Sequence, residues 1–212
     1  MALLEGSGLA CHRGGRDVFR DLGFSLDEGQ ALLVTGPNGS GKSSLLRLLA
    51  GLLRPSAGNL LFAGRAIDED AAAYRRRLCY VGHADALKPV LTVEENLAFW
   101  VRGPKAGGAT TALEALALSS LRDLPARLLS QGQRRRLALS RLLVADAKLW
   151  LLDEPTVGLD AAARRALARV VAEHRAAGGL VVLSAHEAVD LPDAKTLALD
   201  DHAVVRAPEM VW

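Results

Sequence analysis

Hydrophobic positions along the chain form short continuous apolar runs that are separated by longer segments with helical spacing. The runs at 31–35, 149–152 and 180–184 are apolar throughout, which is typical of strands buried on both faces of a parallel sheet. Shorter runs predict the remaining strands, which are 59–62, 79–81, 196–199 and short β segments at 2–4, 18–19 and 24–26. Turn residues separate the first segments, including Gly14-Gly15.

Helical spacing follows several of these runs. Residues 43–50 and 161–177 predict helices, so strands and helices alternate as in an α/β fold. The segment 87–145 breaks this alternation, because it has helical patterns and no convincing strand. Its predicted helices are 92–100, 111–118 and 132–144. We therefore expect one domain, with a helical subdomain at about 87–145 inserted into a core formed by 1–86 and 146–212.

Composition excludes several classes of protein. The chain has 212 residues, of which 50% are hydrophobic, so it can bury a sizeable core. Only two cysteines are present, which excludes a disulfide scaffold. Lys and Arg number 26 against 24 Asp and Glu, and this balance argues against a dedicated nucleic-acid binder. We expect the arginine runs 75–77 and 134–136 to lie on solvated helix faces.

The sequence carries no membrane signal. No stretch approaches the roughly 18 uncharged apolar residues that a spanning helix needs, and the first residues lack the basic start of a signal peptide. We expect a cytoplasmic protein, in which any attachment to a membrane comes through a partner.

The strongest motif is a phosphate-binding loop between the strand 31–35 and the helix 43–50. Its glycines let backbone N–H groups surround phosphate oxygens, and the helix N-terminus adds its positive dipole. We expect Lys42 to reach the β- and γ-phosphates and the Ser43 hydroxyl to bind Mg²⁺. The predicted nucleotide-binding residues of this loop are Gly36, Pro37, Asn38, Gly39, Ser40, Gly41, Lys42, Ser43 and Ser44.

Two adjacent carboxylates follow the apolar strand 149–152. Asp153 has the position of the acidic partner in the Mg²⁺ site of a phosphate-loop ATPase, and it joins the predicted nucleotide-binding set. Glu154 is placed to activate the attacking water as a general base. An acid pair after a strand is usually a solvated strand end, so this prediction depends on the phosphate-binding loop that accompanies it.

A third motif, Leu129-Ser130-Gln131-Gly132-Gln133, resembles the signature of the ATP-binding cassette family at a helix start. The usual family form has glycine where Gln131 stands. Two further elements follow in the family's order. Asp160 resembles the family's D-loop aspartate, although it could simply cap the next helix, and His186 resembles the switch histidine that contacts the γ-phosphate.

The resemblance covers essentially the whole chain and implies a RecA-like P-loop core, an antiparallel β subdomain and a helical signature subdomain. It implies ATP and Mg²⁺ as ligands, with Lys42, Glu154 and His186 as catalytic residues. It also implies a head-to-tail homodimer with two ATP molecules at the interface. Ser130, Gln131, Gly132 and Gln133 of one chain would then face the ATP held by the other chain.

Two positions depart from the family pattern. Most cassettes have a glutamine in the Mg²⁺ site after the strand that here is 79–81, whereas this chain has Gly82-His83. His83 either replaces the glutamine or is a surface residue, and both interpretations stay open. An aromatic residue that stacks on adenine is also expected, and the aligned position is Arg13.

Within the family, the chain resembles the cytochrome c biogenesis ATPases, or haem exporter ATP-binding subunits. The resemblance rests on Tyr80-Val81-Gly82-His83, Leu129–Arg136 and Leu149–Pro155. It implies a bacterial translocase subunit, peripheral on the cytoplasmic face of the inner membrane, that couples ATP hydrolysis to haem delivery through a multi-spanning partner.

Three alternatives remain. The first is a cassette for another transported substrate, which would share all the catalytic residues. The second is a soluble cassette ATPase that acts on ribosomes or DNA, which the absence of a second cassette and of a long coiled-coil insert disfavours. The third is a regulatory nucleotide-binding module without turnover, and Glu154 argues against it.

Overall fold

The computed structural model describes residues 2–101, 108–186 and 189–202. Its strands are β1 (Leu4–Arg13), β2 (Arg16–Leu26), β3 (Ala31–Thr35), β4 (Ala57–Phe62), β5 (Arg65–Ala66), β6 (Leu78–Val81), β7 (Leu149–Asp153), β8 (Leu180–Ser184) and β9 (Lys195–Ala198). Its α-helices are α1 (Lys42–Leu49), α2 (Ala71–Arg76), α3 (Val93–Ala98), α4 (Ala109–Ala115), α5 (Gln131–Val144) and α6 (Ala161–Ala176). Three short 3₁₀ turns complete the list, which are η1 (Ser119–Leu121), η2 (Ala126–Leu128) and η3 (Leu199–His202).

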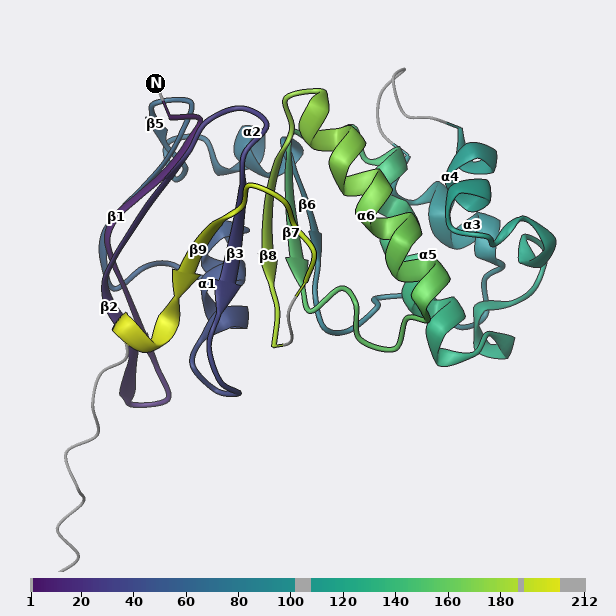
Figure 1. Cartoon of the computed structure of the whole chain (residues 1–212), viewed down its shortest axis with the longest axis horizontal. Coiled ribbons are helices and arrows are strands. Elements are labelled where there is room, and N and C mark those ends of the chain that lie inside the picture. The colour runs from purple at the N-terminus through teal and green to yellow at the C-terminus, as the bar shows by residue number, and fades with distance from the viewer. Residues whose placement is uncertain (1, 102–107, 187–188, 203–212) are drawn as a thin grey trace, which may run out of the picture.

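The strands form two sheets. Five strands make a parallel sheet in the order β6-β7-β8-β3-β9, and four make an antiparallel sheet in the order β2-β1-β4-β5. Figure 1 shows α6 lying across one face of the parallel sheet, with β1 and β2 at one end of the molecule and α3, α4 and α5 at the other. This arrangement confirms the predicted α/β class with its antiparallel β portion.

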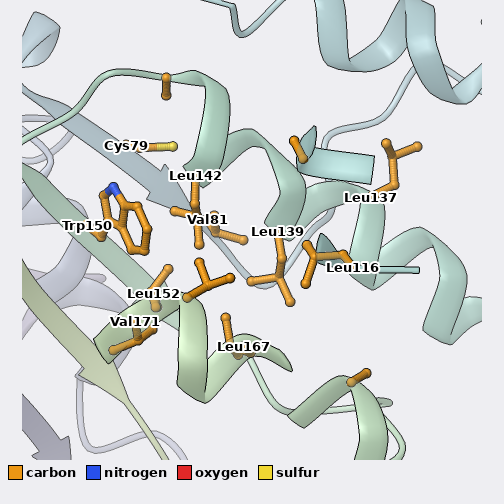
Figure 2. Packing of buried hydrophobic residues seen from close by; sticks show 14 of the residues in the cluster. Cys79, Val81, Leu116, Leu137, Leu139, Leu142, Trp150, Leu152, Leu167 and Val171 are labelled. Carbon is orange, nitrogen blue, oxygen red and sulfur yellow. The ribbon is translucent and has the colours of Figure 1, made fainter. Parts of the chain in front are cut away.

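Alternate residues of β7 face two different cores. Trp150 and Leu152 pack with residues of α5 and α6, as Figure 2 shows, whereas Leu149 and Leu151 pack with α1 and the antiparallel sheet. All five residues of β7 are buried. A continuous apolar sequence is therefore required here, since no position of the strand faces water.

The first strands were predicted too short. The structure replaces the segments 2–4, 18–19 and 24–26 with two long strands, β1 and β2, which pair antiparallel across the predicted Gly14-Gly15 turn. The register of β1 with β2 shifts at several points between Gly6 and His12. Such irregularities disturb the alternation of apolar and polar residues, which explains why the pattern shows only fragments.

The other predicted elements lie within two residues of the structure, except the helix predicted at 111–118, which is α4 and ends three residues earlier. The helix predicted at 43–50 is α1, which begins and ends one residue earlier. The helix predicted at 161–177 is α6, which ends one residue earlier. The strand predicted at 196–199 is β9, one residue earlier in the chain, because Leu199 already belongs to η3. The prediction missed α2, a single short helix that buries only Tyr74.

Between β6 and β7 the described residues form helices and turns, with one isolated β-bridge between Thr92 and Pro125. The division into an inserted helical subdomain and a core stays a prediction. No described helix is long and apolar enough to cross a membrane.

A stacked aromatic pair joins α6 to the parallel sheet. The ring of His174 lies parallel to Trp150, with 3.7 Å between the ring centroids. Its Nε2 atom is buried and makes no hydrogen bond within the described part of the chain. Burial lowers the pKa of His174 from 6.5 to about 4, because a charged imidazole would lose its hydration there.

We predict that this histidine makes folding sensitive to acid. Its folded pKa is depressed, so the unfolded chain binds more protons between pH 6.5 and pH 4, and stability falls as the pH falls through that range. The contribution lost at pH 4 is about 3 kcal/mol. Urea unfolding at pH 7 and pH 4 should show a smaller loss for His174→Phe, which keeps a ring on Trp150. An equal loss in both proteins would contradict the assignment.

Candidate functional site

The phosphate-binding loop lies between the end of β3 and the start of α1. Lys42 is 5% exposed and donates from Nζ to the carbonyl oxygens of Gly36, at 2.7 Å, and Pro37, at 3.0 Å. Gly41 has a φ of +106°, and a Cβ there would lie 2.4 Å from Val18 Cγ1. Only glycine therefore fits where the antiparallel sheet approaches the loop.

The acid pair faces this loop. Lys42 Nζ lies 4.0 Å from Glu154 Oε1, so a cation at the start of α1 and a carboxylate after β7 share one space. The strand β3, which leads into the loop, and the strand β7, which precedes Glu154, are separated in the sheet by β8. Ligands of open α/β sheets bind at this carboxyl edge of the strands.

Ser184 at the end of β8 holds both acidic residues in place through hydrogen bonds. Its hydroxyl donates to Asp153 Oδ1 at 2.8 Å and accepts from the backbone N–H of Glu154 at 3.0 Å. The same N–H approaches the Ser184 carbonyl at 3.2 Å. Glu154 also has a φ of +48°, an unfavourable value for a residue with a side chain. Strain of this kind is retained where several contacts hold the backbone.

The loop and the acid pair fit a divalent cation. Asp153 is 1% exposed, and its Oδ2 atom is buried without a hydrogen-bond partner in the described residues. A buried anionic oxygen needs a partner, and Mg²⁺ accepts one or two carboxylates together with substrate phosphates. Within the described residues no group of three or more His, Cys, Asp and Glu could hold a metal ion alone. The buried Asp153 carboxylate therefore fits a cation, and Ser43 and phosphates as further ligands stay predictions.

The predicted signature begins α5. Ser130 is the N-cap and forms a capping box with Gln133, in which each side chain bonds the other's backbone N–H. A Cβ at Gly132 would lie 2.9 Å from the Gly158 carbonyl oxygen, so this turn packs against the segment before α6. Ser130 and Gln131 are exposed.

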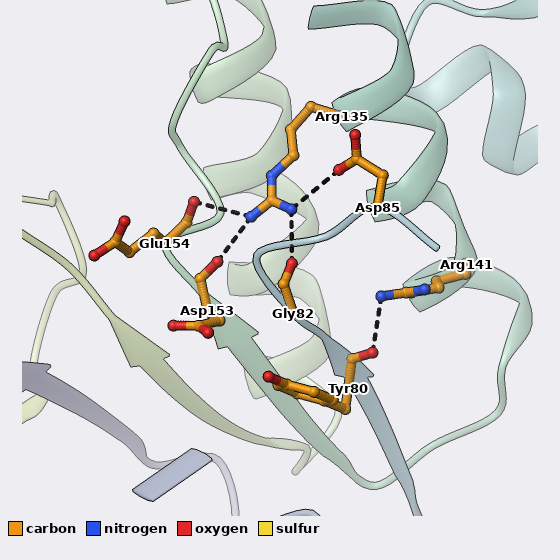
Figure 3. Close-up of polar contacts among 7 residues, drawn as sticks. All are labelled: Tyr80, Gly82, Asp85, Arg135, Arg141, Asp153 and Glu154. Atoms are coloured by element: carbon orange, nitrogen blue, oxygen red, sulfur yellow. Dashed lines mark hydrogen bonds and ion pairs between the residues drawn. The ribbon is translucent and has the colours of Figure 1, made fainter. Parts of the chain in front are cut away.

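The prediction of a solvated arginine run at 134–136 was wrong. Arg135 is 5% exposed, and its guanidinium donates to the carbonyls of Gly82, Asp153 and Glu154 and to the Asp85 carboxylate (Figure 3). Arg136 donates to the carbonyls of Leu116 and Ala117. A run of arginines does not reveal which of them is buried, because only the helix orientation decides that. The run at 75–77 is exposed, as predicted.

Three more polar residues near the site, Arg141, Tyr80 and Ser184, were not among the site residues predicted from the sequence. Arg141 on α5 donates to the Tyr80 carbonyl at 2.8 Å, and its guanidinium lies over the Trp100 ring. Burial and the nearby charge of Asp153 raise the pKa of Tyr80. Ser184 belongs with them, because its role depends on the neighbouring strand β7.

The remaining predicted residues occupy separate positions. His83 follows β6 and is exposed, and His186 follows β8 and is also exposed. Asp160 caps α6 by accepting from the Ala163 N–H at 2.7 Å. Arg13, the candidate for stacking on adenine, is exposed at the end of β1. Their contacts with a nucleotide stay predictions.

Known proteins resemble this chain in sequence and in fold. A family model described as "ABC transporter" matches residues 19–157, which is more than half of the chain. A solved structure titled as the ATP-binding subunit of an ABC transporter is 26% identical, with a TM-score of 0.78, and the match covers 87% of this chain and 79% of that one. A putative ABC transporter ATP-binding protein from Pyrococcus furiosus shares the fold, with 23% identity, a TM-score of 0.81 and coverage of 95% and 99%.

Curated relatives are more similar in sequence. A protein of Paramagnetospirillum magneticum is 54% identical over 92% of this chain and 93% of its own length. One from Rhodospirillum rubrum is 53% identical, with coverage of 95% and 88%, and one from Brucella abortus is 43% identical, with coverage of 98% and 95%. Each is named a cytochrome c biogenesis ATP-binding export protein, CcmA.

We predict that Lys42→Ala weakens phosphate binding and leaves the fold intact. The substitution removes a buried charged donor, and a hydrogen bond to a charged group contributes about 1.5–3 kcal/mol. This corresponds to a loss of roughly 10- to 150-fold in affinity for a nucleoside triphosphate. Isothermal titration with a non-hydrolysable analogue measures the affinity, and circular dichroism checks the fold. Unchanged affinity in a folded variant would contradict the assigned loop.

Proposed function

The chain belongs to the ABC transporter family, and from this premise we propose that it is the ATP-hydrolysing subunit of a transporter for c-type cytochrome biogenesis. In this proposal ATP hydrolysis drives haem export or haem delivery through a separate membrane subunit. The chain then acts as a peripheral protein on the cytoplasmic face of the inner membrane.

The observation that carries the hydrolytic part is the approach of Glu154 to Lys42 across the phosphate-binding loop. Lys42 gives up its bonds to the loop carbonyls and binds the β- and γ-phosphates, which offer stronger anionic acceptors. Ser43 and Asp153 would hold Mg²⁺, and the ion when bound neutralises charge on the phosphate oxygens. Glu154 accepts a proton from the water that attacks the γ-phosphorus, and ADP leaves with the bridging oxygen.

A pocket and exposed apolar side chains near the site support a membrane partner. The pocket is lined by residues 85–87, Pro89, Ala126, Arg127 and Arg134. Close to it in the sequence, Val90, Phe99 and Leu128 are all more than 60% exposed. We infer that these side chains and the pocket form one apolar surface, since exposed apolar patches mark binding sites for other proteins. Asn96 holds the edge of this surface, since its amide bonds Lys88, Leu91 and Thr92.

The exposed start of α5 supports a head-to-tail homodimer. Ser130 and Gln131 cap the helix and face solvent in the single chain. A helix N-terminus attracts anions, and the γ-phosphate of an ATP held by a second chain is one. Each ATP then lies between the phosphate-binding loop of one protomer and the predicted signature of its partner. His186 and, if it replaces the family glutamine, His83 complete the proposed site.

The transported substrate is assigned from similarity. Relatives at 43–54% identity carry names that refer to cytochrome c biogenesis and export. A cassette subunit for another substrate is the second candidate, because the catalytic residues are common to both.

We predict that Glu154→Gln traps the dimer. The amide cannot accept the proton from water, so ATP stays bound and the interface that it forms persists. Multi-angle light scattering with Mg-ATP should give about twice the mass of the nucleotide-free protein. A variant that stays monomeric at high protein concentration would speak against ATP at a dimer interface.

We predict that the same substitution in the native gene abolishes mature c-type cytochromes, because haem delivery then loses its energy source. Haem-stained membranes of the mutant measure this, and other haem proteins should be unaffected. The matched control is Glu173→Gln, the same chemical change at an exposed position of α6. Normal c-type cytochromes together with lost ATPase activity would favour the second candidate.

A further inference from the structure

Arg135 makes four polar contacts with two loops that are far apart in the sequence. Its Nη1 donates to the Gly82 carbonyl at 2.9 Å and to Asp85 Oδ1 at 3.2 Å. Its Nη2 donates to the carbonyls of Asp153 at 2.8 Å and Glu154 at 2.9 Å. With 5% of the residue exposed, these bonds are shielded from water and are stronger than surface contacts.

The contacts join three segments of the candidate site (Figure 3). Arg135 itself lies in the second turn of α5, shortly after the predicted signature. Gly82 and Asp85 flank His83 in the loop after β6, and the other two carbonyls belong to the acid pair after β7. One planar guanidinium therefore connects the signature helix, the His83 loop and the acid pair.

The bond to Glu154 restrains a strained backbone. Glu154 has a φ of +48°, its N–H is held by Ser184, and its carbonyl accepts from Arg135 at 2.9 Å and from the Val157 N–H at 3.3 Å. Among the described residues, the Glu154 carboxylate makes no hydrogen bond, and the cation that it approaches is Lys42, at 4.0 Å. The direction of the carboxylate is thus set through the main chain, and without Arg135 the Glu154 carbonyl loses the shorter of its two hydrogen bonds and keeps the longer one from Val157.

We propose that Arg135 is a positioning residue for ATP hydrolysis: it holds the main chain of Glu154 so that the carboxylate points at the attacking water, and it links that carboxylate to the His83 loop. The inference rests on the proposed ATPase function. Within the described part of the chain, the polar contact of Arg135 with a residue assigned to nucleotide binding is the one to the Asp153 carbonyl. Its loss therefore acts on turnover and spares nucleotide affinity.

Other side chains cannot replace the guanidinium. The two terminal nitrogens of the guanidinium each bond two acceptors. The single ammonium nitrogen of lysine and the single amide nitrogen of glutamine cannot reach both pairs of acceptors. Arg136 provides a matched control on the same helix. It also bonds two main-chain carbonyls, but these belong to Leu116 and Ala117, away from the acid pair.

The test is steady-state ATPase kinetics of the full chain for Arg135→Lys, Arg135→Gln, Arg135→Met and Arg136→Met, with wild type and Glu154→Gln as references. We expect kcat to fall by about 10- to 100-fold in all three Arg135 variants, as for a small misplacement of a catalytic group. KM for ATP should stay within about twofold, and Arg136→Met should keep the wild-type kcat. Circular dichroism checks the fold of each variant. If Arg135→Met does not fold, the kinetics of Arg135→Lys and Arg135→Gln provide the test.

A double variant separates positioning from a structural effect. If Arg135 acts through Glu154, then adding Arg135→Lys to Glu154→Gln should not lower single-turnover hydrolysis further, because the group that it positions is already lost. An additive loss, a raised KM with unchanged kcat, or an equal fall in Arg136→Met would overturn the inference. A wild-type chain without Glu154-dependent ATPase activity would instead refute the proposed function.

Discussion

The complete burial of β7 is the constraint on which the rest of the structure depends. Its five residues are all buried, with alternate side chains in the two cores on either face of the parallel sheet. A strand in this position can expose polar groups only at its ends. The carboxylates of Asp153 and Glu154 stand at its carboxyl end, next to β8 and opposite the loop that follows β3. Packing of apolar side chains thus determines where the acids meet Lys42.

An acid pair at the end of a buried strand needs hydrogen-bond partners for its backbone groups. The chain turns sharply at Glu154, so backbone groups of both acids leave the sheet ladder in a poorly hydrated region, and such groups need partners. Ser184 supplies a hydroxyl from β8, and Arg135 supplies two donors from α5. Both residues satisfy the backbone and leave the Oδ2 atom of Asp153 unpaired. Within the described residues, this network leaves two buried atoms without a hydrogen bond, Asp153 Oδ2 and Arg135 Nε, and of these the anionic oxygen is the one that suits a cation.

The sequence predicts those parts of the molecule whose cause is local. An apolar run, a glycine-rich loop and a capping box each carry their signal within a few residues, so β3, β7 and the start of α5 were located closely. The full length of β1 was missed, because its register shifts obscure the alternation of side chains. Arg135 and Ser184 were missed for another reason. Their partners lie on neighbouring elements, and only the assembled sheet and helix show that the residues meet.

The same contacts give a physical reason for coupling between a partner and the nucleotide. The loop from Gly82 to Lys88 is held at its two ends, by Arg135 and by Asn96, and the Lys88 ammonium lies over the ring of the exposed Phe99. A partner that shifts this loop changes the geometry of the Arg135 guanidinium, which also bonds the Glu154 carbonyl. Coupling between two sites is reciprocal, so nucleotide that reorders the acid pair must equally alter affinity for the partner. Under the proposed function, Arg135 connects partner binding to hydrolysis, because its buried guanidinium bonds both the Gly82 loop and the Glu154 carbonyl.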